Sequence, residues 1–167
     1  MSKISNNTGI LSDIEIQNLL DNEIIISSSK IDNEQVQPAS LDLSLGNKAW
    51  RVKSSFLPGT KNKVTDKISR LAMHEIDLTN GAVLEKGCVY IAEISEFLNL
   101  DPDVSASANP KSSTGRLDIF TRLIVDYANE FENVKPGYNG PLYIEISPRT
   151  FSILVKSGTR LNQIRFR

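Results

Sequence analysis

Cysteine and histidine are nearly absent from the chain, which has one of each in 167 residues, Cys88 and His74. A zinc site takes three or four ligands with close spacing, and no such group of Cys and His exists here, so we predict no metal-ligating residues and no zinc. A lone cysteine excludes an internal disulfide and suits a reducing cytoplasm, where we expect the protein to act. Cys88 opens an apolar run that ends at Ile91, which indicates a buried structural thiol rather than a nucleophile.

Long hydrophobic runs and an excess of one charge are also missing. No apolar run approaches 18 residues, so no membrane span is predicted. Residues 1–9 are polar with one lysine and lack the apolar stretch of a signal peptide, and we expect residues 1–10 to form a flexible tail. A net charge of −1 argues against nucleic acid as a partner, because proteins that follow phosphate backbones are usually basic.

The composition that remains is typical of a soluble globular protein, with 40% hydrophobic and 23% charged residues. The length predicts a single domain over residues 1–167. A helix should begin at Ser12, since Ser12 and Glu15 match a capping box, and should end near Asp21.

The rest of the chain predicts short strands. Leu41, Leu43 and Leu45 alternate with polar residues, which indicates a strand with one buried face. We expect residues 49–52 to form its hairpin partner after a turn at 47–48, and residues 54–66 to form a polar loop. Further strands are predicted within 82–94, 104–108, 117–125, 142–147, 153–155 and 161–166. Many short strands with few helices predict a mainly β sandwich or barrel.

Residues 109–116, Asn-Pro-Lys-Ser-Ser-Thr-Gly-Arg, concentrate donors suited to an anion. Lys111 supplies a point charge, Ser112 and Ser113 supply hydroxyls, and Arg116 supplies a planar fork. A short helix starting at Ser112 would add its free N–H groups. The pattern favours a phosphate site, although Ser-Ser-Thr-Gly is also common in ordinary loops.

Residues 136–145 predict a turn followed by a strand. Leu142, Ile144 and Ile146 should face the core, so Tyr143 and Glu145 should project from the other face. A carboxylate held on a rigid strand suits acid–base chemistry, whereas the plainer alternative is a solvated surface glutamate.

Three segments together resemble the dCTP deaminase family of the trimeric dUTPase-like superfamily. Residues 37–46 are similar to its Gln-Pro-Ser-Ser-x-Asp-Leu-Arg-Leu-Gly segment, 111–117 to its Arg-Ser-Ser-x-x-Arg-Leu motif, and 136–145 to its Pro-Gly-Trp-x-Gly-x-x-x-x-Glu motif. The order of the three and the Pro-to-Glu spacing make the resemblance specific. The sequence of residues 109–116 is most similar to that of a longer subgroup, in which two such domains follow each other in one chain.

The resemblance implies a distorted jelly-roll barrel of the β-clip, dUTPase-like kind, with an N-terminal helix and a few short helices. It implies a homotrimer with sites between subunits, or a pseudo-symmetric assembly with a second half. The implied activity is zinc-independent hydrolytic deamination of dCTP to dUTP, in the synthesis of dUMP and dTTP, with Mg²⁺ on the triphosphate. The implied roles are Glu145 as general base, Arg116 and Ser112 as its catalytic support, Lys111, Ser112, Ser113 and Arg116 as substrate-binding residues, and Tyr138 near the nucleoside.

Three departures from the family pattern favour an alternative. Lys135 stands where the family has an aspartate that meets the sugar, and the segment between Arg116 and Pro136 is several residues longer. The sequence also stops at Arg167, without the family's C-terminal tail that closes over the triphosphate. The alternative is a non-catalytic nucleotide-binding or assembly domain of the same fold that serves a catalytic partner half.

Overall fold

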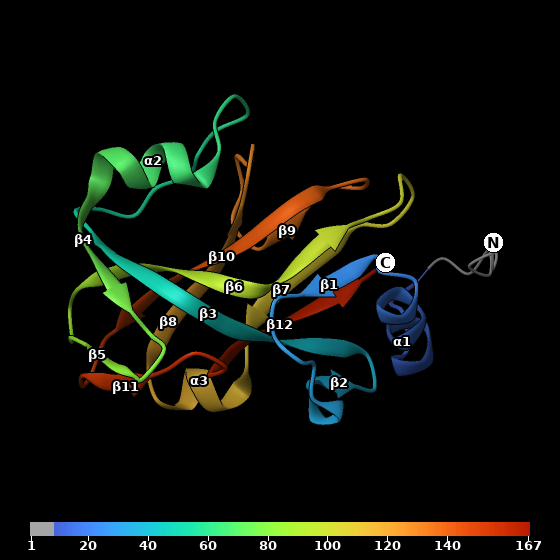
Figure 1. Cartoon of the computed structure of the whole chain (residues 1–167), viewed down its shortest axis with the longest axis horizontal. Helices are drawn as coiled ribbons and strands as arrows, with labels where there is room; N and C mark the ends of the chain where they lie inside the picture. The colour runs from blue at the N-terminus through green and yellow to red at the C-terminus, as the bar shows by residue number, and fades with distance from the viewer. Residues whose placement is uncertain (1–8) are drawn as a thin grey trace.

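The structure is a computed structural model, and it describes residues 9–167. Figure 1 shows a body built mainly of strands, with one helix at the N-terminal end and two further short α-helices. The elements in chain order are α1 (Asp13–Asp21), β1 (Ile25–Ser27), the 3₁₀ helix η1 (Asn33–Gln35), β2 (Val36–Gln37), β3 (Ser40–Val52), α2 (Val64–Leu71), β4 (Ala72–Asp77), β5 (Ala82–Leu84), β6 (Val89–Asn99), β7 (Ala106–Pro110), α3 (Ser112–Arg116), β8 (Ile119–Val125), β9 (Asn133–Val134), β10 (Asn139–Pro148), β11 (Ile153–Val155) and β12 (Arg160–Phe166). The predicted tail at 1–8 lies outside the described residues, and Gly9 and Ile10 are exposed.

The strands form one large antiparallel sheet with the order β8-β10-β6-β3-β12-β7-β9, and β1, β2 and β4 pair at its sides. A separate two-stranded sheet joins β11 to β5. Strand β8, at one end of this order, also contacts β7 and β9 at the other end, so the sheet nearly closes on itself. The predicted mainly β barrel with an N-terminal helix is therefore confirmed. None of the described helices is long and apolar enough to cross a membrane.

The N-terminal helix forms as its local sequence predicts. The Ser12 hydroxyl accepts a hydrogen bond from the Glu15 backbone N–H, and the Glu15 carboxylate accepts one from the Ser12 N–H at 2.9 Å. The Leu11 N–H donates to the Phe166 carbonyl at 2.9 Å, so the start of α1 is tied to the last strand. Figure 1 shows the C-terminus beside α1 for this reason.

The predicted hairpin at 41–52 is wrong, because residues 40–52 form the single strand β3. The first half of β3 pairs with β12, and the second half pairs with β4 and β6. The register between β3 and β6 shifts between Leu45 and Ala49, so the polar residues Asn47 and Lys48 lie at a strand irregularity rather than in a turn. A local turn pattern was overridden by pairing with distant strands.

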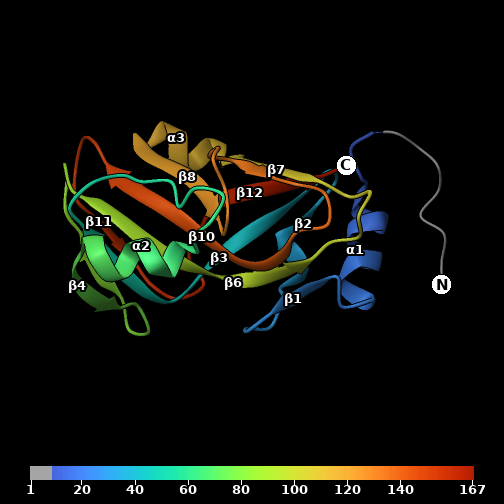
Figure 2. The ribbon, with the colours of Figure 1, turned by 90° about the horizontal axis from the view of Figure 1, so that it is seen from above.

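The sheet buries apolar side chains on both faces, in two clusters. Leu142, Ile144 and Ile146 of β10 enter the larger cluster, as predicted, and Tyr143 enters the smaller one on the opposite face. The smaller cluster is covered by α2, which begins inside the stretch that we expected to be a loop. Helix α2 starts where the Val64 N–H donates to the Asp126 carboxylate at 2.8 Å, a contact between distant segments that no local pattern reveals. Figure 2 shows α2 and α3 on opposite sides of the sheet.

Candidate active site

Glu145 is the carboxylate that the fold holds most firmly at the predicted site. It lies opposite Arg122 in the pairing of β10 with β8, and Arg122 Nε donates to Glu145 Oε2 at 2.7 Å. Only 2% of Glu145 is exposed, so the alternative of a solvated surface glutamate does not hold. The other oxygen, Oε1, accepts no hydrogen bond from the described residues, and it is not among their fully buried unpaired atoms.

Arg122 is itself held from several directions. Its Nη2 donates to Ser55 Oγ at 2.9 Å. Its guanidinium carbon lies 3.7 Å from the centre of the Phe131 ring and 4.9 Å from that of Phe120, within the range of cation–π attraction. Strand alternation along β8 could have indicated that Arg122 shares a face with Phe120, but nothing in the sequence indicated that it meets Glu145.

The predicted phosphate motif folds as expected, with α3 beginning at Ser112. Ser112, Ser113 and Arg116 are exposed. Lys111 precedes the helix, and its ammonium forms an ion pair with Asp42, a carboxylate that is 2% exposed. The structure therefore joins two of the resembling segments, 37–46 and 111–117, through one ion pair.

The structure does not bring all predicted catalytic residues together. No hydrogen bond or ion pair within residues 9–167 links Glu145 to Ser112 or Arg116. Helix α3 packs on β8 and β12, where the Thr114 hydroxyl donates to the Leu161 carbonyl at 2.8 Å. Within residues 9–167 of one copy, the predicted anion-binding motif is thus not joined to the Glu145 carboxylate by a hydrogen bond or an ion pair.

Tyr138, predicted to lie near the nucleoside, is half-buried. Its hydroxyl donates to the Pro141 carbonyl at 2.7 Å and accepts from the Asp126 N–H at 3.2 Å. Burial raises the pKa of Tyr138 far above its usual value of 10, so the hydroxyl stays protonated and can donate. Tyr138 and Lys135 line a mainly apolar cavity of about 110 Å³ beneath the segment that joins β8 to β9.

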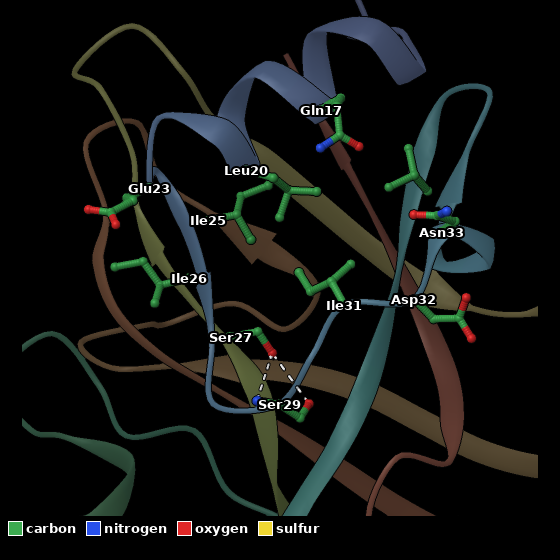
Figure 3. Close-up of a pocket in the computed structure, with 11 residues that line it drawn as sticks. Gln17, Leu20, Glu23, Ile25, Ile26, Ser27, Ser29, Ile31, Asp32 and Asn33 are labelled. Atoms are coloured by element: carbon green, nitrogen blue, oxygen red, sulfur yellow. Dashed lines mark hydrogen bonds between the residues drawn. The ribbon is translucent and has the colours of Figure 1, made fainter.

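A second hollow, of about 330 Å³, lies between α1, β1 and η1 (Figure 3). The side chains around it mix apolar and polar groups, among them Leu20, Ile31 and Asp32, and the Ser29 N–H donates to Ser27 Oγ at 3.3 Å on its wall. None of the predicted site residues lines this hollow.

Among residues 9–167, no three His, Cys, Asp or Glu side chains gather closely enough to hold a metal ion. His74 is exposed on β4, and Cys88 is half-buried against the larger core cluster. The absence of a resident metal therefore stays a prediction.

Residues 7–167 match the family described as the 2'-deoxycytidine 5'-triphosphate deaminase (DCD) N-terminal domain. A crystal structure of 2'-deoxycytidine 5'-triphosphate deaminase from Agrobacterium tumefaciens superposes with a TM-score of 0.94 at 59% sequence identity. That match covers 96% of this chain and 46% of the other, so this chain spans less than half of that protein.

Curated relatives are more distant in sequence. The dCTP deaminase of Halorubrum lacusprofundi is 27% identical over 161 residues, covering 94% of this chain and 76% of the relative. A dUMP-forming dCTP deaminase of Nanoarchaeum equitans is 30% identical over 155 residues, covering 82% of this chain and 72% of the relative. Fold and site thus define a barrel protein with a buried carboxylate–guanidinium pair. The chain belongs to the family of dCTP deaminase N-terminal domains.

Proposed function

We propose that this chain catalyses the hydrolytic deamination of dCTP to dUTP and ammonia, a step toward dUMP and dTTP. The observation that carries the proposal is Glu145, a buried carboxylate on a rigid strand with one oxygen held by Arg122 and the other available. The names of the relatives support an enzyme over the non-catalytic binding domain.

Glu145 serves as the general base for this reaction. Water gives one proton to Glu145 and its oxygen to ring carbon 4 of the cytosine. The same proton then passes to the amino nitrogen, which leaves as ammonia. The second water proton goes to ring nitrogen 3, and the oxygen remains as the carbonyl of uracil. A positioned carboxylate can perform both transfers without a metal.

The triphosphate is held by Lys111, Ser112 and Ser113, with Mg²⁺ carried on its phosphate oxygens. The exposed Ser112 and Arg116 complete a site on a neighbouring copy, in a homotrimer with sites between subunits. Their exposure, and the absence of a hydrogen bond or ion pair between them and Glu145 within the described residues of one copy, support this arrangement. We infer that the protein acts in the cytoplasm, where its nucleotide substrate would be available.

The direct test is ammonia release from dCTP by the purified chain, with and without Mg²⁺ and with the products separated. We expect dUTP and ammonia in equal amounts, and restoration of activity by Mg²⁺ alone after strong chelation. Release of dUMP and pyrophosphate instead would show a dUMP-forming enzyme. Activity that returned only with zinc would contradict the mechanism, and binding of dCTP without turnover would establish the non-catalytic alternative.

Glu145→Gln tests the base. Glutamine keeps the shape of the side chain and one oxygen for Arg122, but it cannot accept the proton from water. Loss of a general base typically lowers the rate by ~10²–10⁴-fold, and we expect this with little change in dCTP affinity. The matched control is Glu75→Gln, an exposed glutamate on β4, which should keep the wild-type rate. Near-normal deamination by Glu145→Gln would rule out this role.

The trimer is tested by sedimentation equilibrium. A stable monomer with full activity would contradict a site shared between copies. A trimer whose activity is lost on dilution, together with its assembly, would support the shared site.

A further inference from the structure

Arg122 is the side chain in direct contact with the proposed base, and the fold restrains it more than an ordinary surface arginine. Only about 29% of its side chain is exposed, against 2% for Glu145. One face of its guanidinium lies against Phe131, Phe120 is within 5 Å of it, and its Nη2 is bound by Ser55. Its direction is therefore determined by parts of the chain far apart in sequence.

The geometry of the ion pair divides the carboxylate into a held oxygen and an available one. Arg122 Nε binds Oε2, while Oε1 accepts no hydrogen bond from the described residues and is not sealed among their buried unpaired atoms. A base that accepts a proton from water needs one such oxygen, pointing in a constant direction.

We infer that Arg122 is a positioning residue for the deamination: it orients Glu145 through Oε2 so that Oε1 meets the attacking water. The inference rests on the proposed function and adds a residue to its machinery. Arg122 is suited to this because its planar guanidinium donates hydrogen bonds in fixed directions, which matches the geometry of a carboxylate.

A purely structural ion pair is the competing explanation. Burying two charges costs desolvation energy that their attraction barely offsets, so such a pair is weak evidence for stability. Ser55 and Phe131 come from irregular segments before α2 and after β8, and both contact the guanidinium of Arg122, while Phe131 also packs against the smaller core cluster. Convergence on one guanidinium is what a preorganised site requires.

The test compares Arg122→Gln and Arg122→Lys with Arg149→Gln in the full chain. Arg149 also lies over the Phe120 ring, at 5.1 Å, but it makes no ion pair with Glu145, so it is the matched control. A misdirected base can cost ~10²-fold in rate, and we expect that loss in kcat for Arg122→Gln. The KM for dCTP should change by less than about threefold, because uniform substrate binding is kept. Lysine keeps the charge without the fork, so Arg122→Lys should recover part of kcat, and Arg149→Gln should stay at the wild-type value.

A second variant, Ser55→Ala, loosens Arg122 without removing it. Ser55 is exposed, so this variant should fold normally, and kcat should fall several-fold. The inference is overturned if the wild type deaminates dCTP while Arg122→Gln and Ser55→Ala retain its kcat. It is overturned equally if the loss in Arg122→Gln appears in KM alone. A wild type that does not deaminate at all would instead overturn the proposed function, so the two failures are distinguishable.

Discussion

Lys111 forms an ion pair with Asp42 while also standing at the N-terminal end of the proposed phosphate-binding helix. The two roles have different consequences. A phosphate contact affects substrate binding, whereas the partner of a buried carboxylate affects folding. About 27% of the Lys111 side chain is exposed and 3% of that of Asp42, so the ammonium can reach an incoming phosphate while it neutralises a nearly buried charge.

Lys111→Ala should therefore lower stability as well as raise the KM for dCTP. Removing one partner leaves an uncompensated buried charge, which costs 3–5 kcal/mol when both groups are fully buried, and roughly 1–3 kcal/mol here because Lys111 reaches solvent. Urea unfolding measures the loss. The double variant Lys111→Ala/Asp42→Asn should recover most of the stability but not the KM. Unchanged stability of the single variant would show that the ion pair contributes nothing to folding.

There is no room for a side chain at Gly140, because the ring of Tyr138 fills the space where its Cβ would lie. A Cβ at Gly140 would lie 2.5 Å from the Tyr138 hydroxyl oxygen and 2.8 Å from the ring carbon that carries it. The ring has little freedom to move, since its hydroxyl is bound to the backbone of Asp126 and Pro141.

We expect Gly140→Ala to lower the free energy of unfolding by about 1–3 kcal/mol, the usual cost of overpacking. The matched control is Gly115→Ala in α3, where a Cβ would meet nothing within 4 Å, so stability should be unchanged or slightly higher. Thermal unfolding of both variants makes the comparison. Equal melting temperatures would show that Tyr138 moves aside freely.

At the scale of elements, helix α1 is the clearest case of a segment specified by its own sequence. Its capping box satisfies two backbone N–H groups at the helix start, and Ile16 and Leu19 face the core. Strand β3 is the opposite case, because its length follows from the strands on either side of it.

Ser12→Ala should destabilise the protein by about 1 kcal/mol, because the first turn of α1 loses its side-chain cap. The midpoint of urea unfolding should fall without a change in slope. Ser54→Ala is the control, since Ser54 is exposed and makes no side-chain hydrogen bond with the described residues. A midpoint for Ser12→Ala equal to that of the control would mean that the cap is dispensable.

At the scale of the whole molecule, a cluster of buried polar side chains joins β8, the segment around Glu132 and β12. The Leu123 N–H donates to Glu132 Oε1 at 2.6 Å, and the Thr121 hydroxyl donates to the Asn162 side-chain oxygen at 2.7 Å. Glu132 Oε2 and Asn162 Nδ2 are buried, and neither makes a hydrogen bond of ordinary geometry with any of residues 9–167. Burial raises the pKa of Glu132 to about 7, against the opposing effects of the Leu123 N–H, the Asn162 amide and the charge of Arg122.

Stability should therefore fall as the pH rises. The folded state binds the Glu132 proton more tightly than the unfolded state, in which the pKa of this carboxyl is near 4.5. The stabilisation that comes from the tighter proton binding is therefore complete below pH 4.5 and is lost as the pH rises through about 7. We expect a loss on the order of 2 kcal/mol across that window, measured by urea unfolding at several pH values. Glu132→Gln should flatten this part of the profile, and an unchanged slope in that variant would assign it to other carboxylates.

The sequence by itself determined the features that depend on neighbouring residues. These are the cap of α1, the alternation that turns Glu145 away from the main core, the start of α3 at Ser112, and the ordered motifs that indicate the family. Hydrogen bonds within one turn and the two-residue period of a strand act over a few residues, so their signals can be read locally.

The tertiary structure alone decided which distant groups meet. The pairing of Glu145 with Arg122, the ion pair of Lys111 with Asp42 and the continuity of β3 all depend on strand register across the sheet. Register is selected by the burial of whole faces and by partners far away in the chain, and a shift of one residue would turn each side chain to the other face. For this reason Glu145 could be singled out from its motif, while Arg122, which holds its carboxylate, became visible only in the folded sheet.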